Sequence, residues 1–495
     1  MDYRSTRDNS INISSMDAII KGISEDGGLF VPEYIPKFEN FDSFKGEGFS
    51  ELAYKVLSIF LTDYREDELK FAVKNAYDGK FSSRDIVEIK KTNNAYFLEL
   101  FHGPTSAFKD MALQIMPHLL HFALKKKEIK EKIVILVATS GDTGKAALEG
   151  FKDIEGIEVV VLYPNKGVSD IQRAQMQTQT GGNLHVIAIN GNFDDAQNEV
   201  KSIFSDKEYN DRLLENGFRL SSANSINIGR LIPQITYYFY AYLKMLENKE
   251  IKMNEEINIV VPTGNFGNIL AAYYAKEMGL PINRLICASN DNNVLTDYFN
   301  LGEYNKNREL LLTSSPSMDI LISSNLERFI YHISDGDDKL VNQKMKELSE
   351  NGKYSTNSIP HALISGEFIN EEEVSYWIKR VFKEENYVMD PHTAVAYGAY
   401  QKYIQKTQDK HKTLIASTAS PYKFPAKVLN SIGIRQPEND FLAMEILEKN
   451  TDAKFPEKLR ELSKLPIIHD IVVDKENIKR TLSKLLEGGN NHDPN

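Results

Sequence analysis

From residue 95 onward, short apolar runs of strand length alternate with stretches in which apolar residues recur at helical spacing. This alternation predicts an α/β architecture whose mainly parallel strands are buried on both faces. Ligand sites then belong at the carboxyl ends of the strands. The expected strands are residues 96–100, 133–137, 159–163, 185–189, 257–261, 285–288 and 413–416, and the expected helices lie near 105–127, 144–152, 168–179, 193–205, 228–246, 267–278 and 391–405.

The first 80 residues follow a different pattern. Helical spacing appears around residues 16–22, 50–62 and 66–76, and a Gly-Gly turn ends at residue 28. We therefore expect three parts: a small, mostly helical N-terminal domain over residues 1–80, a catalytic domain of two α/β subdomains over 81–435, and a helical C-terminal extension over 436–495.

Composition narrows the class of protein. A chain of 495 residues with 41% hydrophobic residues can bury large cores, and a net charge of -11 argues against a nucleic-acid partner. Cys287 is the single cysteine, which excludes an internal disulfide and a cysteine-rich metal site. His118 and His121 share a helix face without further ligand-spaced partners, so no metal is expected. With no apolar run of membrane-spanning length and a polar N-terminus, we expect a cytoplasmic protein without membrane contact.

The sequence HGPTSAFKD at residues 102–110 places Lys109 at the start of a long apolar-periodic helix. Gly103 and Pro104 indicate a turn, Thr105 or Ser106 is expected to cap the first helical turn, and Pro117 is expected to kink the helix. The first turn of a helix favours acids over cations. A surface lysine on an amphipathic helix is the ordinary interpretation of such a position, and position alone does not exclude it.

The loop ATSGDTGK at residues 138–145 follows an expected strand and opens an expected helix, so its backbone amides can bind an anion. A nucleotide-binding P-loop is excluded, because that motif needs glycine where Thr139 stands and serine or threonine where Ala146 stands. We expect Asp142 to cap the following helix, and the residues alone leave open whether it also meets a ligand.

Three further stretches place polar groups at the ends of strands or the starts of helices. In PTGNFGN (262–268), glycines allow the backbone to approach a ligand closely, although one such loop is weak evidence by itself. STASPYKF (417–424) follows a buried strand, and SSANSINIGR (221–230) reads by itself as a capped helix start. DPHTAVAY (390–397) is assigned to packing.

Taken together, these stretches resemble the threonine synthases, a family that carries a lysine motif of the form HGPT-x-AFKD. Residues 22–32, GISEDGGLFVP, resemble the N-terminal signature of the same family, and the likeness extends from Gly22 to about Phe424. The resemblance implies a tryptophan-synthase-like fold, fold type II of the pyridoxal phosphate enzymes. It implies pyridoxal phosphate as the cofactor, bound to Lys109 as a Schiff base. Because a free lysine amine has a pKa near 10.4, such a lysine needs surroundings that lower its pKa.

The resemblance also implies roles for individual residues. The cofactor phosphate is expected on the loop of residues 264–268, and the pyridine nitrogen on the Thr418 hydroxyl. The substrate carboxylate is expected near residues 140–143, and a second phosphate at Arg230. The candidates are Lys109, Gly264, Asn265, Phe266, Gly267, Asn268 and Thr418 for the cofactor, and Ser140, Asp142, Thr143, Asn224 and Arg230 for the substrate; Asn224 is a weaker candidate than Arg230, as are Ser222 and Asn227.

Family membership implies that O-phospho-L-homoserine and water become L-threonine and phosphate, with the Lys109 amine moving protons at the substrate carbons. A pyridoxal-dependent lyase or dehydratase on the same scaffold is the alternative. It stays open because Ser420 and Tyr422 stand where the family segment has histidine and alanine. A non-catalytic sensor that kept the fold is a third possibility. We expect a small-molecule substrate as partner and a monomer or homodimer.

Overall fold

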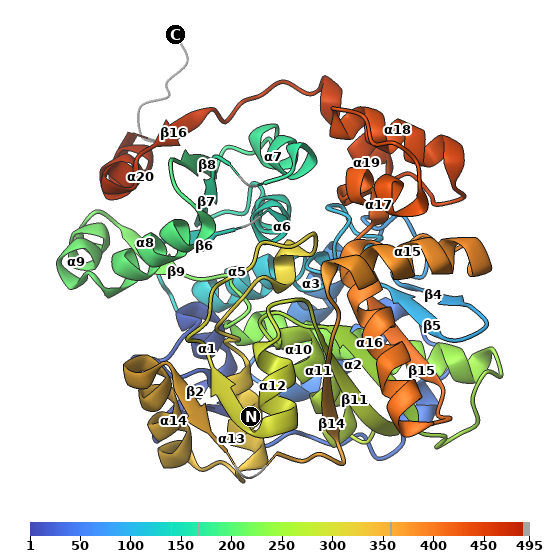
Figure 1. Cartoon of the computed structure of the whole chain (residues 1–495). Coiled ribbons are helices and arrows are strands. Elements are labelled where there is room, and N and C mark those ends of the chain that lie inside the picture. The colour runs from blue at the N-terminus through green and yellow to red at the C-terminus, as the bar shows by residue number, and fades with distance from the viewer. Residues whose placement is uncertain (140, 167, 357–358, 489–495) are drawn as a thin grey trace.

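The computed structural model describes residues 1–139, 141–166, 168–356 and 359–488 (Figure 1). Its first 77 residues combine three helices with a three-stranded antiparallel sheet of order β2-β1-β3. The helices were expected. The sheet was not, because its strands are short and β2 has no fully buried position. The elements are β1 (Asp2–Ser5), β2 (Asp8–Ser14), α1 (Ser15–Lys21), β3 (Phe30–Pro32), α2 (Phe49–Phe60) and α3 (Glu66–Tyr77).

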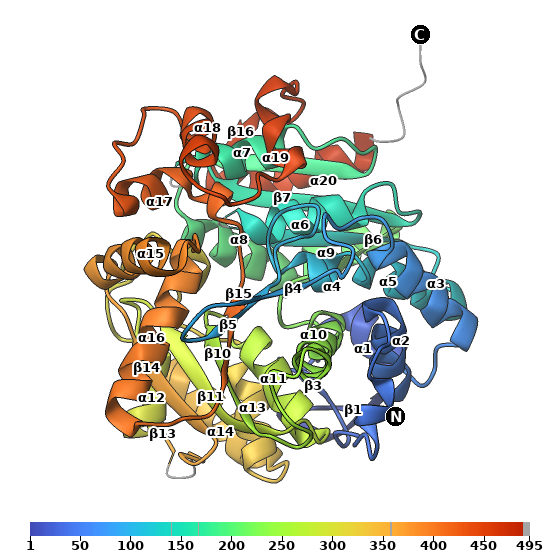
Figure 2. The ribbon, with the colours of Figure 1, turned by 90° about the vertical axis from the view of Figure 1, so that its right-hand side faces the viewer.

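A six-stranded sheet forms the first α/β subdomain. Ile259 in its centre packs into one hydrophobic cluster with α10 and α11, whereas the next residue, Val260, packs into another with α16, so helices cover both faces (Figure 2). Only the edge strand β4 runs antiparallel. The strands, in spatial order, are β14 (Ile364–Phe368), β11 (Ile282–Ser289), β10 (Ile257–Pro262), β15 (Thr413–Ser417), β5 (Tyr96–Glu99) and β4 (Glu88–Lys91), and the covering helices are α10 (Ile228–Glu247), α11 (Gly267–Glu277), α15 (Glu371–Glu385) and α16 (Pro391–Thr407).

A second, fully parallel sheet of five strands forms the other subdomain. Ile135 faces the cluster that contains α5 and α6, and its neighbour Leu136 faces α8, α9 and α20. The predicted burial on both faces is therefore confirmed. The elements are β16 (Ile471–Val473), β8 (Leu184–Ile189), β7 (Ile157–Pro164), β6 (Lys132–Ala138), β9 (Phe218–Ser221), α5 (Met116–Lys126), α6 (Asp142–Phe151), α7 (Asp170–Gln177), α8 (Phe193–Ser205), α9 (Lys207–Glu215) and α20 (Ile478–Gly488).

The remaining elements connect or flank these sheets. The C-terminal segment crosses from the first subdomain to the second and contributes β16 to the edge of the second sheet (Figure 1). Among the described residues, no helix combines the length and apolar character needed to cross a membrane. The other elements are α12 (Val294–Leu301), β12 (Glu303–Asn305), α13 (Leu326–Ile333), α14 (Asp338–Asn351), β13 (Lys353–Ser355), α17 (Pro425–Ile432), α18 (Asp440–Asn450) and α19 (Glu457–Arg460).

The expected helix over residues 105–127 is two helices, α4 (Asp110–Leu113) and α5, and α5 has Pro117 in its first turn. Proline is tolerated there because the first amides of a helix have no partner within the helix. The predicted cap by Thr105 or Ser106 is wrong. Instead, the buried Asp110 carboxylate accepts hydrogen bonds from the Thr105 N–H and hydroxyl, both at 2.8 Å, and closes the loop onto the helix start.

Candidate active site

Lys109 lies at the end of the loop that follows β5, directly before α4, and only 9% of the residue is exposed. Two backbone hydrogen bonds join this loop to the segment after β15. The Phe108 N–H donates to the Thr418 carbonyl at 2.8 Å, and the Ser420 N–H donates to the Ser106 carbonyl at 3.1 Å. Since β5 and β15 are parallel neighbours, their carboxyl ends bring Lys109 and Thr418 to the same edge of the sheet, as predicted.

Two polar groups among the described residues contact the Lys109 amine. Its Nζ lies 3.5 Å from Asp142 Oδ2 and 3.1 Å from the Ser317 hydroxyl. Burial lowers the pKa of this amine; Asp142 opposes that effect, and the nearby cations Lys423 and Arg230 add to it. The residue thus has the depressed pKa that a reactive lysine requires.

Asp142 is buried between two lysines. Its Oδ1 lies 2.6 Å from Lys423 Nζ and accepts a hydrogen bond from Gln172 at 2.9 Å, while its Oδ2 faces Lys109. Although burial acts to raise it, the pKa of Asp142 is held far below its usual range by Lys423 and Lys109 and by hydrogen bonds. This carboxylate is ionised and already paired.

The prediction that Asp142 caps α6 is wrong. The hydroxyl of Thr139 fulfils that function, because it accepts hydrogen bonds from the N–H groups of Gly141 at 2.9 Å and Gly144 at 3.0 Å. Thr143 lies in the first turn of α6 and is half-buried. The candidate Ser140 lies outside the described residues.

The loop between β10 and α11 presents a row of backbone N–H groups. Within the described chain, the amides of Gly264, Asn265, Phe266, Gly267 and Asn268 have no hydrogen-bond acceptor. Phe266 adopts the left-handed conformation (φ 63°) at the start of α11, and its side chain forms no cap. The helix dipole and the row of amides together favour an anion here.

Space at this loop is limited by the short 3-10 turn Pro316–Met318. A Cβ on Gly264 would lie 2.4 Å from the backbone oxygen of Ser317, so only glycine allows the two segments to pack this closely. The side-chain nitrogen of Asn268 is buried without a partner among the described residues.

Arg230 occupies the first turn of α10 and is 3% exposed. One of its nitrogens donates to the Ala223 carbonyl at 2.7 Å, but within the described structure its Nε has no acceptor and no carboxylate pairs with it. Burial lowers the pKa of the guanidinium to about 10, partly opposed by Tyr237. A buried, unpaired cation close to Lys109 is a second position for an anion.

The weaker candidates around Arg230 form its support. The backbone of half-buried Asn224 donates to the Ser222 hydroxyl at 3.1 Å. Asn227 caps α10 and donates to the Ile19 carbonyl at 2.9 Å, which ties this loop to the N-terminal domain. Asn325 Nδ2 then joins the loop to the amide row, since it donates to the carbonyls of Ser225 and Asn265.

Sequence reasoning missed Lys423 and Ser317. Lys423 stands inside the quoted stretch STASPYKF, whereas Ser317 lies in a turn without periodic pattern. The stretch assigned to packing also reaches the site: the His392 ring bonds to Asp390 at 2.6 Å and accepts the Ser317 N–H at 3.3 Å. These contacts hold the turn against Lys109.

Ser420 and Tyr422, the departures from the family segment, have structural contacts. The Ser420 hydroxyl accepts the Tyr422 N–H at 3.3 Å. The Tyr422 ring stacks on Phe455 with centroids 4.5 Å apart, and its hydroxyl donates to the Ala453 carbonyl at 2.8 Å. Tyr422 thus holds the C-terminal segment against the turn that carries Lys423.

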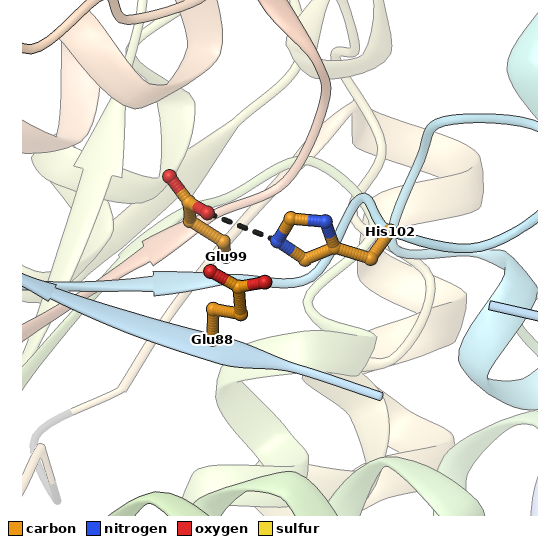
Figure 3. A group of neighbouring side chains, drawn as sticks. All are labelled: Glu88, Glu99 and His102. Carbon is orange, nitrogen blue, oxygen red and sulfur yellow. Dashed lines mark hydrogen bonds and ion pairs between the residues drawn. The ribbon is translucent and has the colours of Figure 1, made fainter. Parts of the chain in front are cut away.

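Among the described residues, Glu88, Glu99 and His102 have ligand atoms within 4.8 Å of one another (Figure 3). His102 Nε2 lies 2.9 Å from Glu99 Oε2, and Lys90 Nζ lies 2.6 Å from Glu88 Oε2. Each carboxylate therefore has a partner within the protein, and the group fixes the start of the Lys109 loop. The absence of a metal stays a prediction.

Family models match nearly the whole chain: "Threonine synthase N terminus" over residues 2–77, "Pyridoxal-phosphate dependent enzyme" over 85–418, and "Threonine synthase, C-terminal" over 393–481. Threonine synthase of Saccharomyces cerevisiae is 36% identical over 98% of both chains. The chain belongs to the threonine synthase family. Threonine synthase of Schizosaccharomyces pombe is similarly related, with 37% identity over 86% of this chain and 88% of that one.

Solved structures of threonine synthases have the same overall fold as this chain. A PLP-bound threonine synthase from Brucella melitensis superposes with a TM-score of 0.87 at 33% identity, covering 99% of this chain and all of that one. Threonine synthase from yeast gives the same TM-score at 35% identity, over 98% and 99%. The predicted fold class, family and cofactor are confirmed, and the chain is a pyridoxal phosphate-dependent lyase.

The described residues fit this cofactor. A buried lysine of lowered pKa suits an aldehyde, and the amide row of residues 264–268, without internal acceptors, suits a phosphate. The Thr418 hydroxyl, with no hydrogen-bond partner among the described residues, lies beside the lysine loop. A hydroxyl there suits a pyridine nitrogen.

Proposed function

We propose that this chain converts O-phospho-L-homoserine and water into L-threonine and phosphate. One observation carries the proposal: a buried lysine of lowered pKa lies near two separate positions for anions, the amide row of residues 264–268 and the unpaired Arg230. A phosphorylated cofactor and a phosphorylated substrate together need two such positions. A lyase acting on an unphosphorylated amino acid would need a position for only one phosphate, in addition to the one for its carboxylate.

The amide row would hold the cofactor phosphate, with Gly264 allowing close approach and the Asn268 side-chain nitrogen as a further donor. The Thr418 hydroxyl would meet the pyridine nitrogen. When bound, pyridoxal phosphate supplies an electron sink that stabilises negative charge on the substrate carbons. The protein supplies the orientation and the proton transfers.

Lys109 would be the residue that moves protons. An ordinary lysine amine is neutral only about once in a few thousand molecules at neutral pH. Burial raises that fraction for Lys109, since it lowers the pKa of the amine. Its Nζ can then accept a proton from a substrate carbon and return it to the neighbouring position.

Arg230 would bind the substrate phosphate through the guanidinium edge that has no partner within the described structure, and Asn224 lies beside it. Thr143, in the first turn of α6, is proposed for the substrate carboxylate together with Ser140, which precedes it in the sequence. Asp142 would line this region as part of a neutral ion pair, because its carboxylate is already paired with Lys423.

The test is product analysis after incubation of the cofactor-loaded protein with O-phospho-L-homoserine. Threonine and phosphate in equal amounts from the wild type, and neither from Lys109→Ala, are expected. Phosphate accompanied by 2-oxobutyrate would make the chain the alternative lyase. Loaded protein that releases no phosphate would refute the proposed substrate.

We also assign the fold to type II of the pyridoxal phosphate enzymes, on the strength of its two α/β subdomains and the lysine between them. A cytoplasmic location and a monomeric or homodimeric state stay predictions from the sequence. Light scattering of the purified chain measures the latter.

A further inference from the structure

Lys423 is a second lysine in the site, and it is completely buried, with 0% exposure. It ends the 3-10 turn Pro421–Lys423 that follows Thr418. Its Nζ lies 2.6 Å from Asp142 Oδ1 and 3.3 Å from the Thr105 carbonyl. A lysine this deeply buried needs such acceptors, because an ammonium group without a partner is costly in the interior.

The same carboxylate also faces the reactive lysine. Asp142 Oδ2 lies 3.5 Å from Lys109 Nζ, so one negative charge is shared unequally between two amines. The shorter contact goes to Lys423. The Ser317 hydroxyl, 3.4 Å from the same Oδ2, and the Gln172 amide are neutral neighbours.

We propose that Lys423 is a positioning residue that acts through Asp142: it neutralises the carboxylate, so that the neighbouring Lys109 amine is left uncharged and reactive. An unpaired Asp142 would attract a proton to Lys109 and convert it into an ammonium ion, which can neither attack an aldehyde nor accept a proton. Paired with Lys423, the carboxylate has little net field at Lys109.

The other charged groups around Lys109 do not replace this function. Arg230, from α10, carries a positive charge and adds to the effect of Lys423. Asp110, the first residue of α4, directs both carboxylate oxygens to Thr105. Within the described part of the chain, Asp142 is the one carboxylate that contacts Lys109.

The proposal predicts opposite shifts from the two partners. Lys423→Met leaves Lys109 as the only cationic contact of Asp142 in the described part of the chain, and it raises the pKa of Lys109. Asp142→Asn leaves the Lys423 charge unbalanced and lowers the pKa of Lys109. The double variant replaces a neutral pair by two neutral side chains, and its pKa returns close to that of the wild type. Each single substitution is expected to move the pKa of Lys109 by about 1–3 pH units.

The experiment measures the pH dependence of reductive methylation of Lys109 in full-length protein from which the cofactor has been removed, by peptide mass spectrometry. Only the neutral amine reacts, and exposed Lys130 serves as an internal standard. Below the pKa, Lys423→Met should slow labelling about tenfold for each pH unit by which the pKa of Lys109 rises, and Asp142→Asn should accelerate it. The rate at which added pyridoxal phosphate changes the visible absorbance should follow the same order.

Lys427→Met is the matched control. Lys427 forms a similar 2.7 Å ion pair, with Glu371, but contacts neither Asp142 nor Lys109. It should leave the labelling profile unchanged. Thermal unfolding of every variant separates a charge effect from lost structure. If Lys423→Met does not fold, the downward shift in Asp142→Asn and its reversal in the double variant still test the proposal.

Shifts in the same direction for both single variants, or no shift in either, would overturn the inference. It rests on Lys109 as the reactive lysine of the proposed function. The labelling needs neither substrate nor turnover, so a wrong substrate assignment shows itself in product analysis while leaving the labelling result intact.

Discussion

Two residues of the site leave buried polar atoms without a hydrogen-bond partner among the described residues. Arg230 Nε and Asn268 Nδ2 are buried and have no partner in the described structure. Each buried group without a hydrogen bond costs about 1–3 kcal/mol. In the proposed function, the phosphate groups of cofactor and substrate would supply the missing acceptors, so the same unpaired groups would strengthen binding.

Removal of the Arg230 guanidinium should therefore weaken substrate binding selectively. We expect Arg230→Met to lower kcat/KM for O-phospho-L-homoserine at least tenfold, since charged hydrogen bonds contribute about 1.5–3 kcal/mol each. Arg230→Lys should retain only part of the wild-type kcat/KM, because lysine lacks the planar guanidinium group that binds a phosphate through two nitrogens. Steady-state kinetics measure both, and Arg219→Lys on the surface is the control. An unchanged kcat/KM in Arg230→Met would show that Arg230 does not bind the substrate.

Gly264 provides a test of the cofactor loop. In Gly264→Ala the added Cβ would meet the Ser317 backbone oxygen at 2.4 Å, so the loop or the turn must move. We expect at least tenfold weaker binding of pyridoxal phosphate, measured by fluorescence titration of the protein freed of cofactor. Gly182→Ala, whose Cβ has no neighbour closer than 4.0 Å, should bind it as the wild type does. Equal affinities would show that this close packing is not needed.

At the scale of elements, the pattern of apolar residues predicts a strand or helix correctly where the same face, or both faces, of that element are buried along its whole length. All seven expected strands form, and β6 and β10 extend the expected runs by only one or two residues. The helix expected over residues 105–127 instead breaks before Pro117. Lys423 and Ser317 could not be found by pattern, because their roles arise from contacts with Asp142 and Lys109 across long stretches of chain.

The turn that contains Tyr422 joins the site to the C-terminal segment, so substitutions of Tyr422 are expected to change the stability of the protein. Tyr422→Ala should destabilise the protein by about 3–5 kcal/mol, as other large-to-small changes of buried aromatic residues do. Tyr422→Phe should lower the free energy of unfolding by about 1–3 kcal/mol, because the Ala453 carbonyl loses its hydrogen-bond donor. Denaturant unfolding measures both, with exposed Tyr376→Phe as control. If Tyr422→Ala leaves the free energy of unfolding unchanged, the stacking on Phe455 does not hold this segment.

At the scale of the whole molecule, the C-terminal segment connects the two subdomains. It packs α18 near α7 and adds β16 to the second sheet, and its Lys458 lies 2.9 Å from Glu149 of α6. Glu149 also pairs with Lys145 at 3.1 Å. Although burial opposes it, these two lysines lower the pKa of Glu149 to about 2.

This ion-pair network predicts a pH dependence of stability. A carboxylate with a lowered folded pKa stabilises the protein above its ordinary pKa of 4.5, and that contribution disappears as the pH falls towards about 2. Glu149→Gln should therefore cost up to about 3 kcal/mol at neutral pH, and its difference from the wild type should shrink below pH 4.5. Unfolding at a series of pH values tests this, with exposed Glu384→Gln as control. A difference that is constant with pH would contradict it.

The central claim is that Lys109, and not the buried Lys423, carries the cofactor. The direct measurement is borohydride reduction of the pyridoxal phosphate-loaded protein, followed by peptide mapping of the modified lysine. The structure predicts the label on Lys109 alone, because Lys423 is held by Asp142 at 2.6 Å. A label on Lys423, or on a lysine outside the site, would contradict the account.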